Sequence, residues 1–234
     1  MLNLPLYYTP LPDEMARRAF SLALWWLAAT RTGLGLVEES LARFRDGAPA
    51  GSFAAERPTL VSCTVASADA TGARGAVRIT VRPDWSAALA AAFVERVAAG
   101  FYDGCFFFRV LPGFIAQFGI KPEWAGPKWS RPTPDAPGPG ATNVRGTIAF
   151  AGGAHPTQLF VNLGDNSRLD REHTVPFAQV DDAGMAVLDQ IYTGYKEGSG
   201  QVAAYQQGVD ELQRQFPRMS WIERCAVEPP AAAS

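Results

Sequence analysis

Hydrophobic and polar residues alternate in much of the chain after residue 58. In Ala76–Val81 the apolar positions 77, 79 and 81 alternate with polar ones, and this period of two predicts a strand with one buried face. Leu60–Val65 is a similar apolar run. The two runs are joined by Ala66–Gly75, which contains two glycines and an aspartate, so we predict a hairpin. Further strands are predicted at Cys105–Val110, Phe114–Phe118, Thr147–Phe150, Leu159–Leu163, Phe177–Val180 and Trp221–Val227.

Three segments have helical spacing instead. In Trp85–Ala99 the apolar residues recur at intervals of three and four, and Gly100 ends the predicted helix. Met185–Tyr192 has a shorter apolar stripe of the same kind. Val202–Phe216 is the third predicted helix.

Lys121–Thr142 differs from its surroundings because six of its 22 residues are proline. Proline removes a backbone donor and disfavours both helix and inner strand, so we predict a surface loop. Trp124 and Trp129 lie in this loop. Burial of their rings is expected to hold the loop against the domain.

Many short strands with a few helices predict a mainly β fold. A closed β-barrel accounts for this pattern best, since closure removes exposed strand edges. Hydrophobic residues make up 47% of the chain and charged residues 19%, as in ordinary globular proteins. We therefore predict one folded domain over residues 58–234.

Residues 1–57 are predicted to be an N-terminal helical leader. Ala19–Ala29 is an apolar run preceded by Arg17 and Arg18, which is typical of a secretory signal or an anchor over residues 15–30. The run is shorter than the roughly 20 residues that cross a bilayer. The alternative is an amphipathic helix on the domain surface. Ala48–Pro58 has the composition of a linker, and the secretory pathway or an organelle lumen is slightly favoured over the cytoplasm.

Charge and residue counts exclude several classes of function. The net charge is −2, so no basic field is available to bind nucleic acid. The three cysteines and two histidines do not have the spacing of metal ligands, and no metal site is predicted. No G-x-S-x-G motif of a nucleophilic hydrolase is present.

One long motif points to a known family. Phe101–Gln117 reads Phe-Tyr-Asp-Gly-Cys-Phe-Phe-Phe-Arg-Val-Leu-Pro-Gly-Phe-Ile-Ala-Gln and resembles the signature of the cyclophilins. Further matching segments follow in the family's order, at Gly146–Ala151, Thr157–Val161, Leu169–Asp170, Pro176–Val180 and Gly184–Asp189. The resemblance covers about Thr59 to Val227 and is closest to a divergent branch of the family.

The resemblance implies a fold and an activity. The fold is a closed eight-stranded antiparallel barrel capped by two helices. The activity is peptidyl-prolyl cis-trans isomerisation of proline-containing polypeptides, without a cofactor. Because the first and last strands pair in that fold, the resemblance also implies that Cys63 and Cys225 lie close enough for a disulfide.

The resemblance also implies a set of site residues. Arg109 and Gln117 match the catalytic positions. The substrate-binding positions are matched by Phe114, Ile115, Ala151, Gly152, Gln158, Phe160, Leu169 and His173. Two departures stand out, since Gly152 replaces an asparagine and Arg168 lies nearest to the position of a tryptophan that recognises cyclosporin.

The residue types suit the implied chemistry. Amide resonance sets a barrier of about 18–20 kcal/mol to rotation about the X–Pro bond. A permanently charged guanidinium can hydrogen-bond the prolyl nitrogen, which becomes pyramidal when the amide is twisted. Two alternatives to an isomerase are a non-catalytic module that binds proline peptides and a structural subunit that docks through the tryptophan loop.

Overall fold

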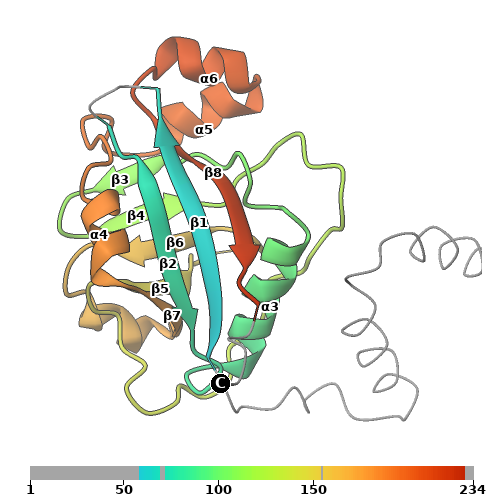
Figure 1. The fold of residues 1–234 in the computed structure, drawn as a ribbon, viewed down its shortest axis with the longest axis vertical. Helices are drawn as coiled ribbons and strands as arrows, with labels where there is room; N and C mark the ends of the chain where they lie inside the picture. The colour runs from blue at the N-terminus through green and yellow to red at the C-terminus, as the bar shows by residue number, and fades with distance from the viewer. Residues whose placement is uncertain (1–57, 69–71, 154, 230–234) are drawn as a thin grey trace, which may run out of the picture. The chain divides into compact units, whose positions relative to one another are not determined.

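The computed structural model describes residues 58–68, 72–153 and 155–229, and in them a mainly β domain with short helices (Figure 1). The strands are β1 Thr59–Ser67, β2 Gly75–Val81, β3 Arg109–Leu111, β4 Ile115–Phe118, β5 Thr147–Phe150, β6 Leu159–Asn162, β7 Pro176–Val180 and β8 Ser220–Val227. The helices are α3 Ala87–Ala98, α4 Asp182–Leu188, α5 Ser199–Gln206, α6 Val209–Gln215 and the 3-10 helix η1 Ser167–Glu172. None of the described helices is long and apolar enough to cross a membrane.

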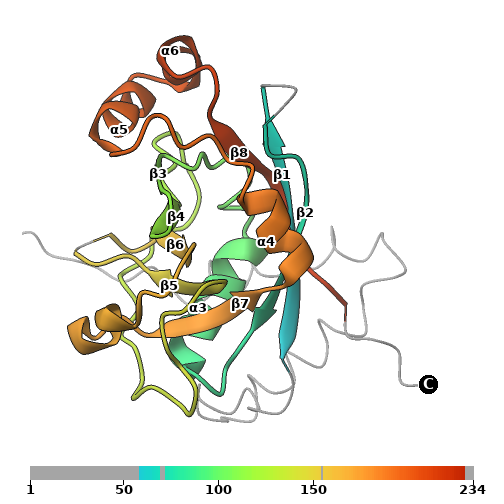
Figure 2. The same cartoon turned by 90° about the vertical axis from the view of Figure 1, so that its left-hand side faces the viewer.

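The eight strands form one antiparallel sheet in the order β3-β4-β6-β5-β7-β2-β1-β8. The sheet curls into a half-barrel (Figure 2), and the prediction of a closed barrel is wrong because its end strands β3 and β8 do not pair. The segment before β3 nevertheless contacts β8, through an isolated bridge between Phe106 and Trp221 and backbone hydrogen bonds of residues 104, 105 and 107 to Ser220 and Ile222. The predicted strand Cys105–Val110 is reduced to β3, since Phe106 and Phe108 turn into a separate apolar cluster beneath α5 and α6.

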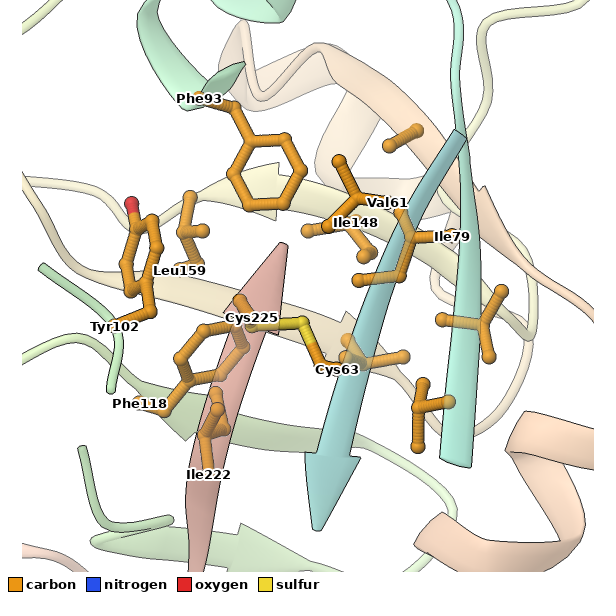
Figure 3. Close-up of a cluster of buried hydrophobic side chains, with 14 of the residues drawn as sticks. Val61, Cys63, Ile79, Phe93, Tyr102, Phe118, Ile148, Leu159, Ile222 and Cys225 are labelled. Carbon is orange, nitrogen blue, oxygen red and sulfur yellow. A yellow bond between two sulfur atoms is a disulfide. The ribbon is translucent and has the colours of Figure 1, made fainter. Parts of the chain in front are cut away.

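The main core fills the concave side of the sheet. It combines alternate strand residues such as Val61, Ile79 and Ile148 with Phe93 of α3 (Figure 3). Both helices that were predicted to cap the sheet contribute apolar side chains to this core. Helix α3 lies beside β8, and α4 lies beside β2 (Figure 1). A small apolar cavity of about 20 Å³ remains in this core, beside the disulfide. It is lined by core residues and is therefore part of the interior rather than a substrate site.

Cys63 and Cys225 form the disulfide that the family resemblance implied. They are directly opposite in the pairing of β1 with β8, with their Cα atoms 4.1 Å apart (Figure 3). The bond joins residues 162 positions apart and so ties the first strand to the last. Cys105 is a buried free thiol.

The predicted third helix is two helices, α5 and α6. The chain bends between them at Gly208, whose φ of 121° is unfavourable for residues with a side chain. The two helices pack on their own small apolar cluster, in which Tyr205 and Leu212 are fully buried. This cluster also contains Phe108, the residue before Arg109, so α5 and α6 support the strand that carries the arginine.

The proline-rich segment is a loop, as predicted, and it is attached to α3. Trp124 and Trp129 are half-buried and pack edge-on against Phe101, with ring centroids 5.2 and 5.4 Å away. The buried Arg96 of α3 donates a hydrogen bond to the Ser130 carbonyl at 3.2 Å. This packing disfavours a docking role for the two tryptophans. The predicted leader, including the signal or anchor segment 15–30, lies outside the described residues.

Candidate functional site

The convex face of β3, β4, β6 and β5 carries a row of residues in register. Arg109 lies opposite Gln117, Gln117 opposite Phe160, and Phe160 opposite Ala149. Residues that lie directly opposite in an antiparallel sheet project on the same side, while their chain neighbours project on the other. The neighbours Val110, Ala116 and Val161 belong to the main core, so the row faces outward.

An apolar cluster separate from the main core lies on this outer face. Its buried members are Ile115, Ala149, Ala151 and Phe160, and the half-buried Phe114 and Leu169 pack against them. All of these except Ala149 were predicted to bind substrate. The structure thus brings five of the eight predicted substrate-binding residues into one apolar cluster.

Arg109 lies at the edge of this cluster with its side chain 26% exposed. Its Cζ is 5.8 Å from the centroid of the Phe114 ring. The guanidinium donates from Nη1 to Gln117 Oε1 at 3.5 Å, and Gln117 Nε2 in turn donates to Gln158 Oε1 at 2.9 Å. The two predicted glutamines therefore form a relay beside the arginine, and Gln158 is 9% exposed.

Sequence analysis missed the main partner of Arg109, which is Glu197. Arg109 Nε donates to Glu197 Oε2 at 2.8 Å, and Nη2 donates to Oε1 at 3.5 Å. Glu197 is in the turn before α5, where a Cβ on Gly198 would meet Phe108 Cδ2 at 2.8 Å and Arg109 Cβ at 3.0 Å. Only glycine fits at this close approach, so the turn is held against β3. Nothing in the run Tyr195–Gly198 indicated a contact 88 residues away.

The ion pair holds the pKa of Glu197 below its ordinary value of 4.5, because Arg109 hydrogen-bonds the charged carboxylate and attracts it. A lowered folded-state pKa means that the contact is present at neutral pH and is lost as the pH falls through that pKa. We therefore predict that Arg109→Ala raises the pKa of Glu197 toward 4.5. A carboxyl ¹³C NMR titration measures this shift.

Glu211 is the matched control for that titration. Its pKa is also lowered by an arginine, Arg214, and it should be the same in both proteins. An unchanged pKa of Glu197 in the Arg109→Ala variant would show that the pair does not form in solution.

A buried amide network supports the other side of the cluster. Asn166 Nδ2 donates to the Phe114 carbonyl at 2.7 Å and to Asn162 Oδ1 at 2.8 Å. Asn162 donates to Asn143 Oδ1 at 3.1 Å, and Asn143 donates to Asp170 Oδ1 at 2.7 Å. Because all three asparagines are at most 3% exposed, these bonds form away from water and fix η1 beside Phe114.

Besides Gln158 of the relay, two predicted substrate-binding residues lie outside the apolar cluster. Gly152 is exposed in the turn after β5. His173 is also exposed and ends η1 with a φ of 56°, where its backbone N–H bonds to the Asp170 carbonyl. The backbone of His173 thus caps η1, and the residue is exposed.

Comparisons with known proteins identify the family of the chain. The family model for cyclophilin type peptidyl-prolyl cis-trans isomerase/CLD matches residues 67–209. Peptidyl-prolyl cis-trans isomerase A of Dickeya dadantii is 33% identical over 107 residues, which cover 44% of this chain and 53% of that protein. A probable peptidyl-prolyl cis-trans isomerase of Brucella abortus is 31% identical over 144 residues, covering 55% of this chain and 72% of that protein.

A solved structure shares the fold. The cyclophilin type peptidyl-prolyl cis-trans isomerase of Cryptosporidium parvum superposes with a TM-score of 0.51 at 15% identity, covering 74% of this chain and 98% of its own. The chain spans about half the length of the Dickeya protein and of a similar isomerase from Acinetobacter baylyi. The matched range contains β2 to α5 with Arg109 and the whole apolar cluster. The chain belongs to the cyclophilin type peptidyl-prolyl cis-trans isomerase family.

Proposed function

We propose that this protein is an active peptidyl-prolyl cis-trans isomerase that assists the folding of proline-containing polypeptides, with Arg109 as its catalytic residue. One observation carries the proposal. The guanidinium of Arg109 lies at the edge of an outward-facing apolar cluster, next to Phe114, which packs against that cluster. A peptide whose proline ring rests on Phe114 and Phe160 would then present its prolyl amide to the arginine.

Catalysis in this proposal comes from a hydrogen bond that strengthens as the amide twists. A planar prolyl nitrogen is a poor acceptor, whereas the pyramidal nitrogen of the twisted state has a localised lone pair. Only an interaction that is stronger in the twisted state lowers the barrier. Glu197 occupies one donor on Nε and one on Nη2, and Gln117 occupies one on Nη1, so one hydrogen on each of Nη1 and Nη2 is left for the substrate. The reaction breaks no covalent bond and needs no cofactor.

The apolar cluster would supply the binding energy. Burying a ring of the size of proline contributes on the order of 1–2 kcal/mol. Phe114, Ile115, Phe160 and Leu169 would form the pocket for this ring, and Ala151 the groove for the preceding residues. Gln158 would hydrogen-bond the substrate backbone and, through Gln117, hold the arginine.

The rival function is a binding module that uses the same pocket without catalysis. A short peptide with one Ala-Pro bond distinguishes the two. The rate of cis-trans isomerisation is measured with and without the protein, and peptide binding is measured in parallel. The proposal predicts acceleration in proportion to protein concentration. Binding without acceleration would establish the rival function instead.

We also propose that the protein works in an oxidising compartment outside the cytosol. The support is the disulfide between Cys63 and Cys225, because structural disulfides persist where thiols are not kept reduced. This agrees with the expectation from residues 15–30. Cell fractionation with an antibody to the protein tests it, and recovery in the cytosolic fraction would contradict it.

A further inference from the structure

A second guanidinium contacts the proposed pocket. Arg168 of η1 is exposed, and its Cζ is 4.7 Å from the centroid of the Phe114 ring. Arg109 contacts the same ring at 5.8 Å, so two cations flank the aromatic residue at the mouth of the apolar cluster. They differ in one respect. Arg109 is paired with Glu197, whereas Arg168 has no ion pair within the part of the chain that the structure describes.

None of the carboxylates close to Arg168 in the sequence pairs with it within the described ranges. Asp170 accepts hydrogen bonds from Thr142 at 2.6 Å and from Asn143 at 2.7 Å. Asp165 accepts from the backbone N–H of Ser167 at 3.0 Å. Glu172, at the end of η1, forms no ion pair within the described ranges. The positive charge of Arg168 therefore remains available at the surface.

The position of Arg168 is set by the fold. Asn166, two residues earlier, is 3% exposed and donates to the carbonyl of Phe114 at 2.7 Å. Asp170, two residues later, is hydrogen-bonded to the loop before β5. Both ends of the turn that carries Arg168 are thus held, which places the backbone of Arg168 beside Phe114.

We propose that Arg168 is a specificity-determining residue that makes the site favour peptides with an acidic side chain next to the proline. The inference rests on the proposed function, since it assumes that the proline ring binds beside Phe114. A carboxylate within one residue of that ring comes within reach of the guanidinium. A lysine or arginine at the same place meets a like charge and is disfavoured.

Two peptide series test the inference, one with Glu, Ala or Lys before the proline and one with the same residues after it. We expect the Glu peptide of at least one series to exceed its Ala counterpart about two- to fivefold in kcat/KM, the range for one exposed ion pair. The Lys peptide should fall below the Ala peptide. Raising the ionic strength should reduce both differences, because exposed charges are screened.

Variants assign the preference to Arg168. Arg168→Gln should abolish it, and Arg168→Glu should reverse it, while both retain activity on the Ala peptide. Arg78→Gln is the control for net charge, since Arg78 is exposed on β2, several strands away from β4 in the sheet. It should keep the wild-type preference. Equal values for Glu and Lys peptides in both series, or the same preference in Arg168→Gln, would overturn the inference.

Binding constants for the same peptides separate this inference from the proposed function. If the protein accelerates the Ala peptide but ignores charge, the inference fails and the isomerase activity stands. If the protein accelerates no peptide but binds the Glu peptides more tightly in an Arg168-dependent way, the inference stands and the catalytic proposal fails.

Discussion

Replacing Arg109 by alanine is expected to lower kcat/KM for an X–Pro peptide at least about tenfold, since loss of one charged hydrogen bond to a transition state typically costs more than 1.4 kcal/mol. The loss should fall mainly on kcat, because the apolar cluster that would bind the ring does not include Arg109. Arg109→Lys should recover little of the activity. A lysine keeps the charge but cannot donate to Glu197 and the substrate in the planar arrangement of a guanidinium.

The control for this prediction is Arg214→Ala. Arg214 also pairs with a glutamate, Glu211, and its side chain is 71% exposed on α6. Loss of such a pair changes stability little, so this variant should retain wild-type kcat/KM. If Arg109→Ala retains it as well, then Arg109 has no part in the mechanism.

The second large effect concerns stability. Replacing Cys63 and Cys225 together by alanine is expected to lower the free energy of unfolding by about 2–5 kcal/mol, the usual loss when a native disulfide is removed. The bond spans 162 residues and joins the first and last strands, so its loss releases a long loop in the unfolded chain. Urea unfolding of the variant and the parent protein under oxidising conditions measures the difference.

Cys105 makes the disulfide experiment simple to interpret. Burial raises the pKa of its thiol to about 12, so it stays protonated near neutral pH and does not exchange with the disulfide. Because two of the three cysteines form the disulfide, denatured but unreduced protein should react with one equivalent of a thiol reagent, and reduced protein with three. Three reactive thiols without reduction would show that the disulfide is absent.

Local patterns predicted the bounds of several strands closely. Thr147–Phe150 has the predicted bounds, and β1, β2 and β8 differ from prediction by at most two residues at either end. The prediction failed at Cys105–Val110, where consecutive phenylalanines give no period of two. In the structure Phe106 and Phe108 belong to one apolar cluster and Phe107 to another, a division that depends on α5 and α6.

Closure of the barrel was predicted both from the many short strands and from the family resemblance, and neither determines whether the end strands pair. Whether two end strands pair depends on the path of segments distant in sequence, and here β3 is only three residues long. Similarly, the predicted helix Val202–Phe216 is interrupted at Gly208, which the sequence alone did not require because a glycine within a helical pattern is compatible with a continuous helix.

The site was predictable where its residues lie within the long motif. Arg109, Phe114 and Gln117 are eight residues apart at most, and the register of β3 with β4 brings them together. Glu197 could not be found this way, because its contact depends on the tertiary position of an exposed turn. A retrospective indication existed for Asn162, since an asparagine at the end of an apolar strand must find a partner when it is buried.

The most direct measurement of the central proposal is the rate of cis-trans exchange of an Ala-Pro peptide at equilibrium, observed by NMR exchange spectroscopy. The wild-type protein and the Arg109→Ala variant are compared with enough peptide to occupy the same fraction of each. We predict rapid exchange with the wild type, and with the variant a bound peptide whose exchange is slower by at least about tenfold. Equal exchange rates in the two proteins at equal occupancy would contradict the assignment of catalysis to this guanidinium.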